Sequence, residues 1–110
     1  MAAFARACAL DDVPDGTARA VVIDGTEVAI VRSGDEVFAI RDECSHAAIP
    51  LSEGDVEGAE IECWLHGSRF DLRTGKAINL PATEPVPVFP CTADGADILV
   101  DVSNPTTDYS

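Results

Sequence analysis

Two short motifs in this chain each pair a cysteine with a histidine. They are Cys44-Ser45-His46 and, after sixteen intervening residues, Cys63-Trp64-Leu65-His66. Both histidines of the chain lie in these motifs, which would be an unusual coincidence for residues without a shared role. Two loops folded against each other could supply two sulfur ligands to one metal and two nitrogen ligands to another. That division of ligands is typical of a [2Fe-2S] cluster held by two cysteines and two histidines.

A single zinc ion is the nearest alternative, because two cysteines and two histidines also form a tetrahedral structural zinc site. The order of the ligands argues against it. Zinc fingers usually place cysteine with cysteine and histidine with histidine across short turns, whereas each motif here contains one of each. We therefore favour the two-iron cluster over zinc, and over the interpretation that these four residues are unligated members of the core.

The segment from Asp42 to Pro90 resembles the Rieske-type ferredoxins, the small electron carriers of aromatic-ring dioxygenase systems, and the run from Cys63 to Asp71 is especially similar. The resemblance implies one [2Fe-2S] cluster in an all-β Rieske fold of antiparallel sheets, with two cluster-binding loops and a proline-containing covering loop. Trp64 departs from the pattern, since many relatives carry proline there, but this position is not a ligand. By the same resemblance, the cysteines bind one iron and the histidines bind the other through Nδ1. The expected metal ligands are Cys44, His46, Cys63 and His66.

Three further residues are expected at the cofactor. Gly67 follows a ligand, and a glycine there either forms an ordinary turn or lets the backbone approach a sulfide closely; we favour the close approach. Ser68 matches a family serine that can donate a hydrogen bond to a bridging sulfide. Pro81 lies in the proline-rich stretch 80–87, which is either an irregular connection at a sheet edge or, by the resemblance, the covering loop. We expect the covering role, because proline preorganises such a loop.

The number of histidines also limits the chemistry. An oxygen-activating mononuclear iron site commonly needs two histidines and a carboxylate, and no histidine remains once His46 and His66 bind the cluster. A Ser-His-Asp or Cys-His hydrolytic site fails for the same reason. We therefore expect no catalytic residues, and an electron-transfer protein rather than an enzyme.

The resemblance also implies the partners of such a carrier. They are a flavin-dependent ferredoxin reductase as the electron donor and a terminal oxygenase as the acceptor. Two alternatives stay open. One is an accessory or redox-sensing Rieske protein linked to iron-sulfur assembly, and the other is a protein like the small subunit of nitrite reductase.

The chain is strongly acidic, with 20 acidic and 7 basic residues and a formal net charge of -13. Repulsion disfavours nucleic acid and anionic membranes as partners. A protein with a positive patch is favoured, although excess acid can also serve solubility alone. Acidic residues recur over 53–62 without a basic one, whereas Arg69, Arg73 and Lys76 follow the second motif. This order predicts fields of opposite sign on the two sides of the cluster.

At 110 residues the chain is long enough for one domain with a modest core. We expect a single Rieske domain over 1–103, a flexible tail over 104–110, and a monomer. The apolar start from Met1 to Leu10 is too short for a signal peptide and runs directly into acidic residues. No segment is long enough to span a membrane. These features predict a cytoplasmic protein, in a compartment where thiols stay reduced and a cluster can be inserted.

Short apolar runs separated by turn residues, without sustained helical periodicity, predict an all-β fold. Asp24-Gly25 is a two-residue hairpin signal, and each motif is expected to open at the end of a strand. Cys8 and Cys91 fall in apparent strands and are expected to pack as small buried hydrophobic residues. The predicted strands are 18–23, 26–32, 36–41, 60–62, 69–72, 76–79, 86–92 and 98–102.

Overall fold

A computed structural model describes residues 4–34, 36–43, 50–63, 67–78 and 86–102. Within these ranges the chain forms short antiparallel strands and two 3-10 helices, which confirms the predicted all-β class. None of the helices in these ranges is long and apolar enough to cross a membrane. The predicted tail over 104–110 lies outside the described residues. The elements are β1 (Ala5–Ala9), η1 (Leu10–Asp12), β2 (Thr17–Ile23), β3 (Thr26–Ser33), β4 (Glu36–Arg41), η2 (Leu51–Glu53), β5 (Asp55–Glu57), β6 (Glu60–Glu62), β7 (Arg69–Asp71), β8 (Val88–Phe89), β9 (Cys91–Asp94) and β10 (Asp97–Val100).

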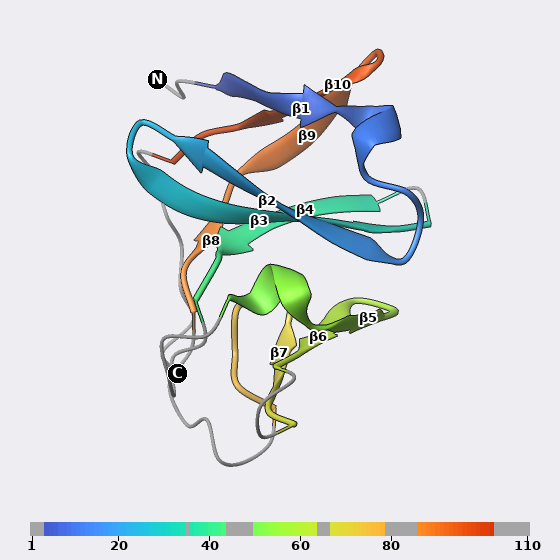
Figure 1. Ribbon diagram of the computed structural model, residues 1–110, viewed down its shortest axis with the longest axis vertical. Coiled ribbons are helices and arrows are strands. Elements are labelled where there is room, and N and C mark those ends of the chain that lie inside the picture. Colours follow the sequence, from blue (N-terminus) through green and yellow to red (C-terminus); the bar gives the residue numbers. More distant parts are fainter. Residues whose placement is uncertain (1–3, 35, 44–49, 64–66, 79–85, 103–110) are drawn as a thin grey trace.

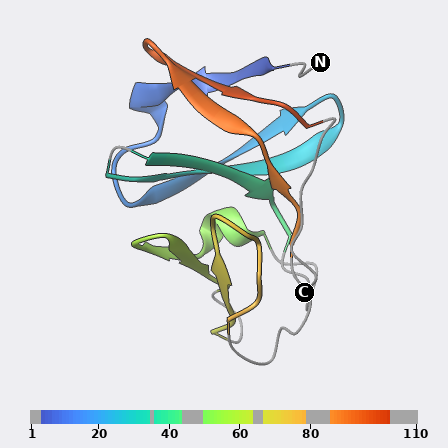
Figure 2. The ribbon, with the colours of Figure 1, turned by 180° about the vertical axis from the view of Figure 1, so that it is seen from behind.

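The strands form three sheets that follow one another along the long axis of the molecule (Figure 1). The first sheet has the strand order β1-β10-β9, the middle sheet β2-β3-β4-β8 and the third sheet β5-β6-β7. Figure 2 shows the same arrangement from behind, with η2 between the middle and third sheets. Cys63 directly follows β6 of the third sheet. The stack therefore places the candidate metal ligand toward one end of the molecule.

The central strand β3 shows why the middle sheet is covered on both faces. Its residues 28–31 are all apolar and fully buried, and successive side chains of a strand point to opposite faces of the sheet. Val28 and Ile30 pack in the core shared with the first sheet, whereas Ala29 and Val31 pack in the core shared with the third sheet. Cys63 belongs to the second of these cores, which we call the lower core. The candidate ligand is therefore packed against the middle sheet.

Several predicted elements are confirmed. β4 and β6 cover the predicted ranges 36–41 and 60–62, and β2 and β3 each extend the predicted range by one residue. Asp24, with a φ of 50°, and Gly25, with a φ of 79°, form the turn between β2 and β3. Positive φ at both positions is what a tight two-residue hairpin requires. The Asp-Gly signal was therefore sufficient to locate this hairpin.

Other predicted strands differ from the structure for identifiable reasons. The predicted strand 86–92 forms two strands, β8 and β9, with Pro90 between them. Proline has no N–H for the ladder, and the Pro90 carbonyl accepts a 3.0 Å hydrogen bond from the N–H of Asp101. The described part of the predicted strand 76–79 is reduced to a bridge between Phe70 and Ala77. β5 was not predicted; like β6 it has one apolar residue between two acidic ones, but no ligand motif follows it to indicate a strand.

Candidate metal centre

Three of the residues predicted to bind the cofactor lie within the described ranges, namely Cys63, Gly67 and Ser68. The other four lie outside them, so their roles stay predictions: Cys44, His46, His66 and Pro81. The described residues on both sides of each motif nevertheless show how the chain enters and leaves it.

The second motif begins where β6 ends, at a buried cysteine. Cys63 is 1% exposed and packs in the lower core with Ile61 and Phe70. Its backbone N–H donates to the carbonyl of Ser68 (2.7 Å), and its carbonyl accepts a hydrogen bond from the N–H of Gly67 (3.0 Å). The chain therefore reverses direction between 63 and 68, and backbone hydrogen bonds join the two ends of the motif.

Gly67 and Ser68 follow this motif, and the structure explains each of them differently. Gly67 has a φ of 75°, a conformation that glycine adopts without the steric cost that a Cβ imposes. The nearest described atom to a Cβ at this position would be Oε1 of Glu62 at 3.3 Å, which is the end of a flexible side chain. The backbone angle alone therefore accounts for Gly67, and its close approach to a sulfide stays a prediction. Ser68 is fully buried, which suits a side chain that faces the protein interior.

The donor chemistry of the described residues fits an iron-sulfur cluster. A cysteine thiolate is a soft ligand of the kind that such clusters use. Cys63 offers one at the end of a strand, in a reversal that two backbone hydrogen bonds hold. A metal site needs ligands whose positions are fixed by their surroundings. Cys63 meets that requirement.

Among the described residues, the two sides of the first motif are joined through the side chain of Asp42. Asp42 directly follows β4, and Ser52 lies in η2. The Asp42 carboxylate accepts a hydrogen bond from the Ser52 N–H through Oδ1 (2.7 Å) and another from the Ser52 hydroxyl through Oδ2 (2.7 Å). We call this pair the Asp42–Ser52 clamp. Sequence reasoning missed Asp42, although an acidic residue at a strand end, two positions before a predicted ligand, was a signal that could have found it.

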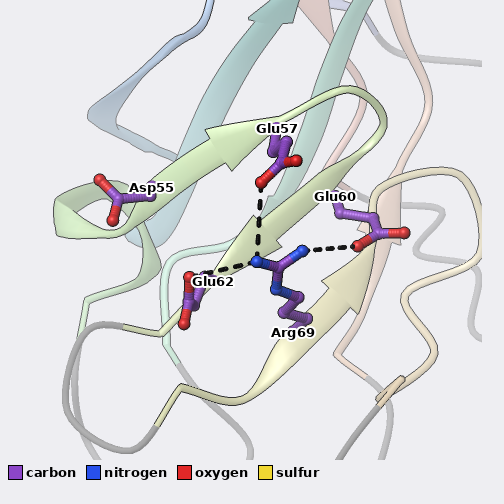
Figure 3. A pocket seen from close by; sticks show the side chains of 5 residues that line it. All are labelled: Asp55, Glu57, Glu60, Glu62 and Arg69. Atoms are coloured by element: carbon purple, nitrogen blue, oxygen red, sulfur yellow. Dashed lines mark ion pairs between the residues drawn. The ribbon is translucent and has the colours of Figure 1, made fainter.

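A shallow pocket on the third sheet gathers acidic residues around one arginine, as Figure 3 shows. Arg69 forms ion pairs with Glu57 (3.6 Å), Glu60 (3.5 Å) and Glu62 (3.7 Å), and Asp55 also lines the pocket. The register of β6 and β7 places Glu62 directly opposite Arg69. The prediction of separate acidic and basic fields is therefore wrong for Arg69, because strand pairing brings the two signs together.

Of the two cysteines outside the motifs, Cys8 is buried as predicted, whereas Cys91 is only partly buried. Cys8 in β1 is 5% exposed, and Cys91 in β9 packs against the same core. Both are free thiols. Burial raises the pKa of the Cys8 thiol and raises the pKa of Cys91 to about 12. Because a thiol must ionise to react or to bind metal, these raised pKa values agree with a packing role.

Known proteins resemble this chain over nearly its whole length. A model of the Rieske [2Fe-2S] domain matches residues 3–90. The biphenyl dioxygenase ferredoxin subunit of Pseudomonas sp. (strain KKS102) is 44% identical over 101 residues, which cover 91% of this chain and 93% of that protein. The solved ferredoxin of carbazole 1,9a-dioxygenase from Nocardioides aromaticivorans IC177 is 43% identical, with a TM-score of 0.85 and coverage of 89% of this chain and 96% of its own. A chain from the complex of reduced oxygenase and oxidized ferredoxin in carbazole 1,9a-dioxygenase is 32% identical, with a TM-score of 0.84 and coverage of 97% of both chains.

These matches confirm the predicted Rieske fold and the predicted cofactor, one [2Fe-2S] cluster. The curated relative is named a ferredoxin subunit and not a catalytic subunit, which confirms the prediction of an electron-transfer component. The family model covers both cysteine-histidine motifs and the described frame around Cys63. The chain therefore belongs to the Rieske [2Fe-2S] domain family.

Proposed function

We propose that this chain carries single electrons from a flavin-dependent ferredoxin reductase to a terminal oxygenase. The observation that carries the proposal is the near full-length match to the ferredoxin subunit of a biphenyl dioxygenase. The fold adds support, because the stack of three sheets holds a buried cysteine at its end in a backbone-bonded reversal. A carrier needs a rigid site close to one end of the molecule and no substrate pocket of its own.

In this proposal each motif provides one ligand to each iron. Cys44 and Cys63 bind one iron, and His46 and His66 bind the other, as the family pattern implies. The cluster, when bound, supplies reversible one-electron transfer at a potential that imidazole ligands raise above that of a four-cysteine cluster. Gly67 turns the chain out of the second motif, Ser68 contributes a buried hydroxyl next to that turn, and Pro81 belongs to the covering loop.

The proposed protein partners fit the charge of the chain. A net charge of -13 favours partners with a positive surface at their docking sites. One structural relative comes from a complex of an oxygenase and a ferredoxin, and we extend that type of pairing to this chain. We place the exchange in the cytoplasm, because free thiols such as Cys8 and Cys91 persist in a reducing compartment.

Spectroscopy and chemical analysis of the purified protein test the cofactor and its ligands. We expect two irons and two labile sulfides per chain, and a rhombic electron paramagnetic resonance signal with a low average g value after reduction by dithionite. Replacing His46 or His66 with cysteine should move the signal toward that of a four-cysteine cluster. A single zinc without labile sulfide would contradict the proposal.

Stopped-flow kinetics test the carrier role. The dithionite-reduced protein is mixed with a candidate Rieske oxygenase, and reoxidation of the cluster is followed by its visible absorbance. We expect reoxidation to saturate with oxygenase concentration and to slow as salt is added, because salt screens the attraction between an acidic carrier and a positive partner. Reoxidation no faster than in buffer alone, across a panel of oxygenases, would contradict the carrier role.

A further inference from the structure

Asp42 is a buried charged residue, with an exposure of 7%. Burying a carboxylate is costly unless hydrogen bonds replace its hydration. Ser52 provides two, one to each carboxylate oxygen and both 2.7 Å long. Hydrogen bonds to an ionised acceptor are shorter and stronger than neutral ones. Because the two bonds use different oxygens, the clamp fixes both the distance and the orientation of Ser52 relative to Asp42.

The clamp is anchored to the middle sheet at its first end. The N–H of Asp42 donates to the carbonyl of Glu27 in β3 (3.1 Å), and the N–H of Arg41 donates to the carbonyl of Pro87 (3.0 Å). These bonds continue the pairing of β4 with its neighbours on both sides. The Asp42 carboxylate therefore extends from a backbone position that cannot shift without breaking sheet hydrogen bonds.

The second end of the clamp is anchored to the strand that leads to Cys63. Leu51, next to Ser52 in η2, is fully buried in the lower core together with Cys63. Gly54, which ends η2, packs so closely against the carbonyl of Glu62 that a Cβ on Gly54 would overlap the oxygen. Its φ is -85°, so the close approach and not the backbone angle requires glycine. The position of η2 is therefore tied to the residue that precedes Cys63.

The place of the clamp in the sequence gives it a role beyond packing. Asp42 and Ser52 are ten residues apart and enclose the first motif, with Cys44 two residues after Asp42. A segment whose ends are already fixed loses less conformational entropy when its ligands bind. A cluster that takes ligands from two motifs also needs a fixed spacing between them. The clamp connects Asp42, which precedes the first motif, to η2, and the end of η2 contacts Glu62 directly before the second motif.

We propose that Asp42 is a positioning residue of the metal centre, which acts through Ser52 to set where the first motif lies relative to Cys63. Asp42 does not touch the cluster in this role. The inference rests on the proposed function, since it requires both motifs to bind one cluster. It goes further in assigning part of the geometry of the cluster to a carboxylate outside the ligand set.

Four variants test the proposal on the holoprotein: Asp42→Ala, Asp42→Asn, Ser52→Ala and the double variant Asp42→Ala with Ser52→Ala. Asp15→Ala is the control for the loss of an aspartate that accepts a backbone hydrogen bond from a distant residue, because the exposed Asp15 binds the N–H of Gly34 (2.6 Å). Gly34 lies in the turn before β4, whereas Asp42 follows the last residue of β4. The readouts are the g values of the reduced cluster, the rate of iron release to a chelator, and the thermal midpoint of unfolding.

We expect Asp42→Ala, which removes both hydrogen bonds of the clamp, to shift the g values and to release iron about tenfold faster, since even one hydrogen bond to a charged group corresponds to a factor of about that size. Ser52→Ala should give an intermediate rate, because the backbone N–H still binds Oδ1. The double variant should match Asp42→Ala, because the clamp is already lost. Asp42→Asn should restore most of the wild-type g values, since an amide oxygen can accept the Ser52 N–H.

Asp15→Ala should lower the midpoint of unfolding without changing the g values or the rate of iron release measured well below that midpoint. The inference is overturned if Asp42→Ala behaves as Asp15→Ala does, with unchanged g values and unchanged iron release. If Asp42→Ala does not fold, Ser52→Ala and Asp42→Asn decide by the same two readouts. A wild-type protein that binds no [2Fe-2S] cluster would instead overturn the proposed function, so the two failures are distinguishable.

Discussion

The segment that contains Cys63 is closed by its own backbone, whereas the segment that contains Cys44 is enclosed by a carboxylate and a serine. In the second segment, Cys63 bonds to Gly67 and Ser68 through N–H and carbonyl groups that every residue except proline provides. In the first segment, the two flanks are joined by the Asp42 carboxylate, which accepts hydrogen bonds from the backbone N–H and the hydroxyl of Ser52. The second segment is short and can form a hydrogen-bonded turn. The first is longer and uses a specific pair of residues.

Because of this difference, the two segments are sensitive to substitution at different positions. The second depends on a positive backbone angle at Gly67 and on the burial of Cys63, so most changes at its other positions leave the hydrogen bonds in place. The first depends on the identity of Asp42, because an unpaired Ser52 N–H or a buried carboxylate without partners costs free energy. Substitutions in the first segment, at Asp42, should therefore change the geometry of the cluster, whereas substitution of Cys63 in the second segment should change its ligation.

The largest effect is expected from the second segment, where Cys63→Ala removes a proposed ligand. We expect complete loss of the bound cluster, measured as iron and labile sulfide per chain, because three remaining ligands leave one iron undercoordinated. Cys8→Ala is the matched control, since Cys8 is also buried but packs in the first sheet. It should keep the cluster and lose about 1 kcal/mol of stability to the cavity. Retention of a full cluster in Cys63→Ala would remove this residue from the ligand set.

The sequence was sufficient to predict those parts of the molecule that local patterns control. Asp24-Gly25 located a hairpin because two positive backbone angles suit these residues. An apolar run located β4, the position directly before Cys63 located β6, and the spacing of cysteine and histidine identified the family. Each of these signals lies within a few residues. None of them depends on how distant parts of the chain pack.

The features that could not be predicted depend on pairs that are far apart in the sequence. The Asp42–Ser52 clamp joins residues ten positions apart, and nothing in either residue alone indicates the other. Arg69 meets Glu57 because β5, β6 and β7 form one sheet, and β5, unlike β6, has no ligand motif after it to indicate a strand. By contrast, the division of the predicted strand 86–92 into β8 and β9 could have been predicted, because Pro90 interrupts the hydrogen-bond ladder.

The next largest effect is expected where the two segments meet, at Gly54. Gly54→Ala places a Cβ against the carbonyl of Glu62, and because that contact is backbone it cannot be relieved by a side-chain rotation. We expect a loss of about 3 kcal/mol in stability, as for other overpacked positions, measured by thermal unfolding followed by circular dichroism. The loss should be accompanied by faster release of iron, because the spacing of the motifs changes.

Gly58→Ala is the control for Gly54→Ala within the same hairpin of the third sheet. Gly58 has a φ of 59° and open space around a Cβ, so alanine there costs only the strain of a left-handed backbone, about 1 kcal/mol. Gly54 carries no such strain, so equal losses in the two variants would show that its contact with Glu62 costs no more than the left-handed backbone at Gly58. The spacing of the two segments would then be set by contacts other than the one between Gly54 and Glu62.

A smaller effect is expected from Ser68→Ala, which separates the side chain from the backbone within the second segment. Ser68 closes this segment through its carbonyl, which alanine retains, so the reversal should survive. If its buried hydroxyl stabilises the reduced cluster, its loss lowers the reduction potential by roughly 20–60 mV, the equivalent of one ordinary hydrogen bond. Protein-film voltammetry measures this shift, with Ser33→Ala at the end of β3 as the control. An unchanged potential in Ser68→Ala would remove the hydroxyl from the redox mechanism.

The smallest effect on stability is expected from Arg69→Gln, directly after Ser68. The side chain of Arg69 is 37% exposed and its ion pairs are 3.5–3.7 Å long, so their loss should cost less than about 1 kcal/mol and should matter less in high salt. Arg73→Gln is the matched control, because Arg73 pairs with Glu36 at 2.8 Å and lies over the ring of Phe38 in the turn beyond β7. Reduction adds one negative charge to the cluster, so removing the positive charge that follows the second segment should lower the potential in Arg69→Gln more than in Arg73→Gln. Equal potentials in the two variants would show that the three carboxylates around Arg69 already cancel its field at the cluster. The second segment would then influence the reduction potential through its hydrogen bonds alone.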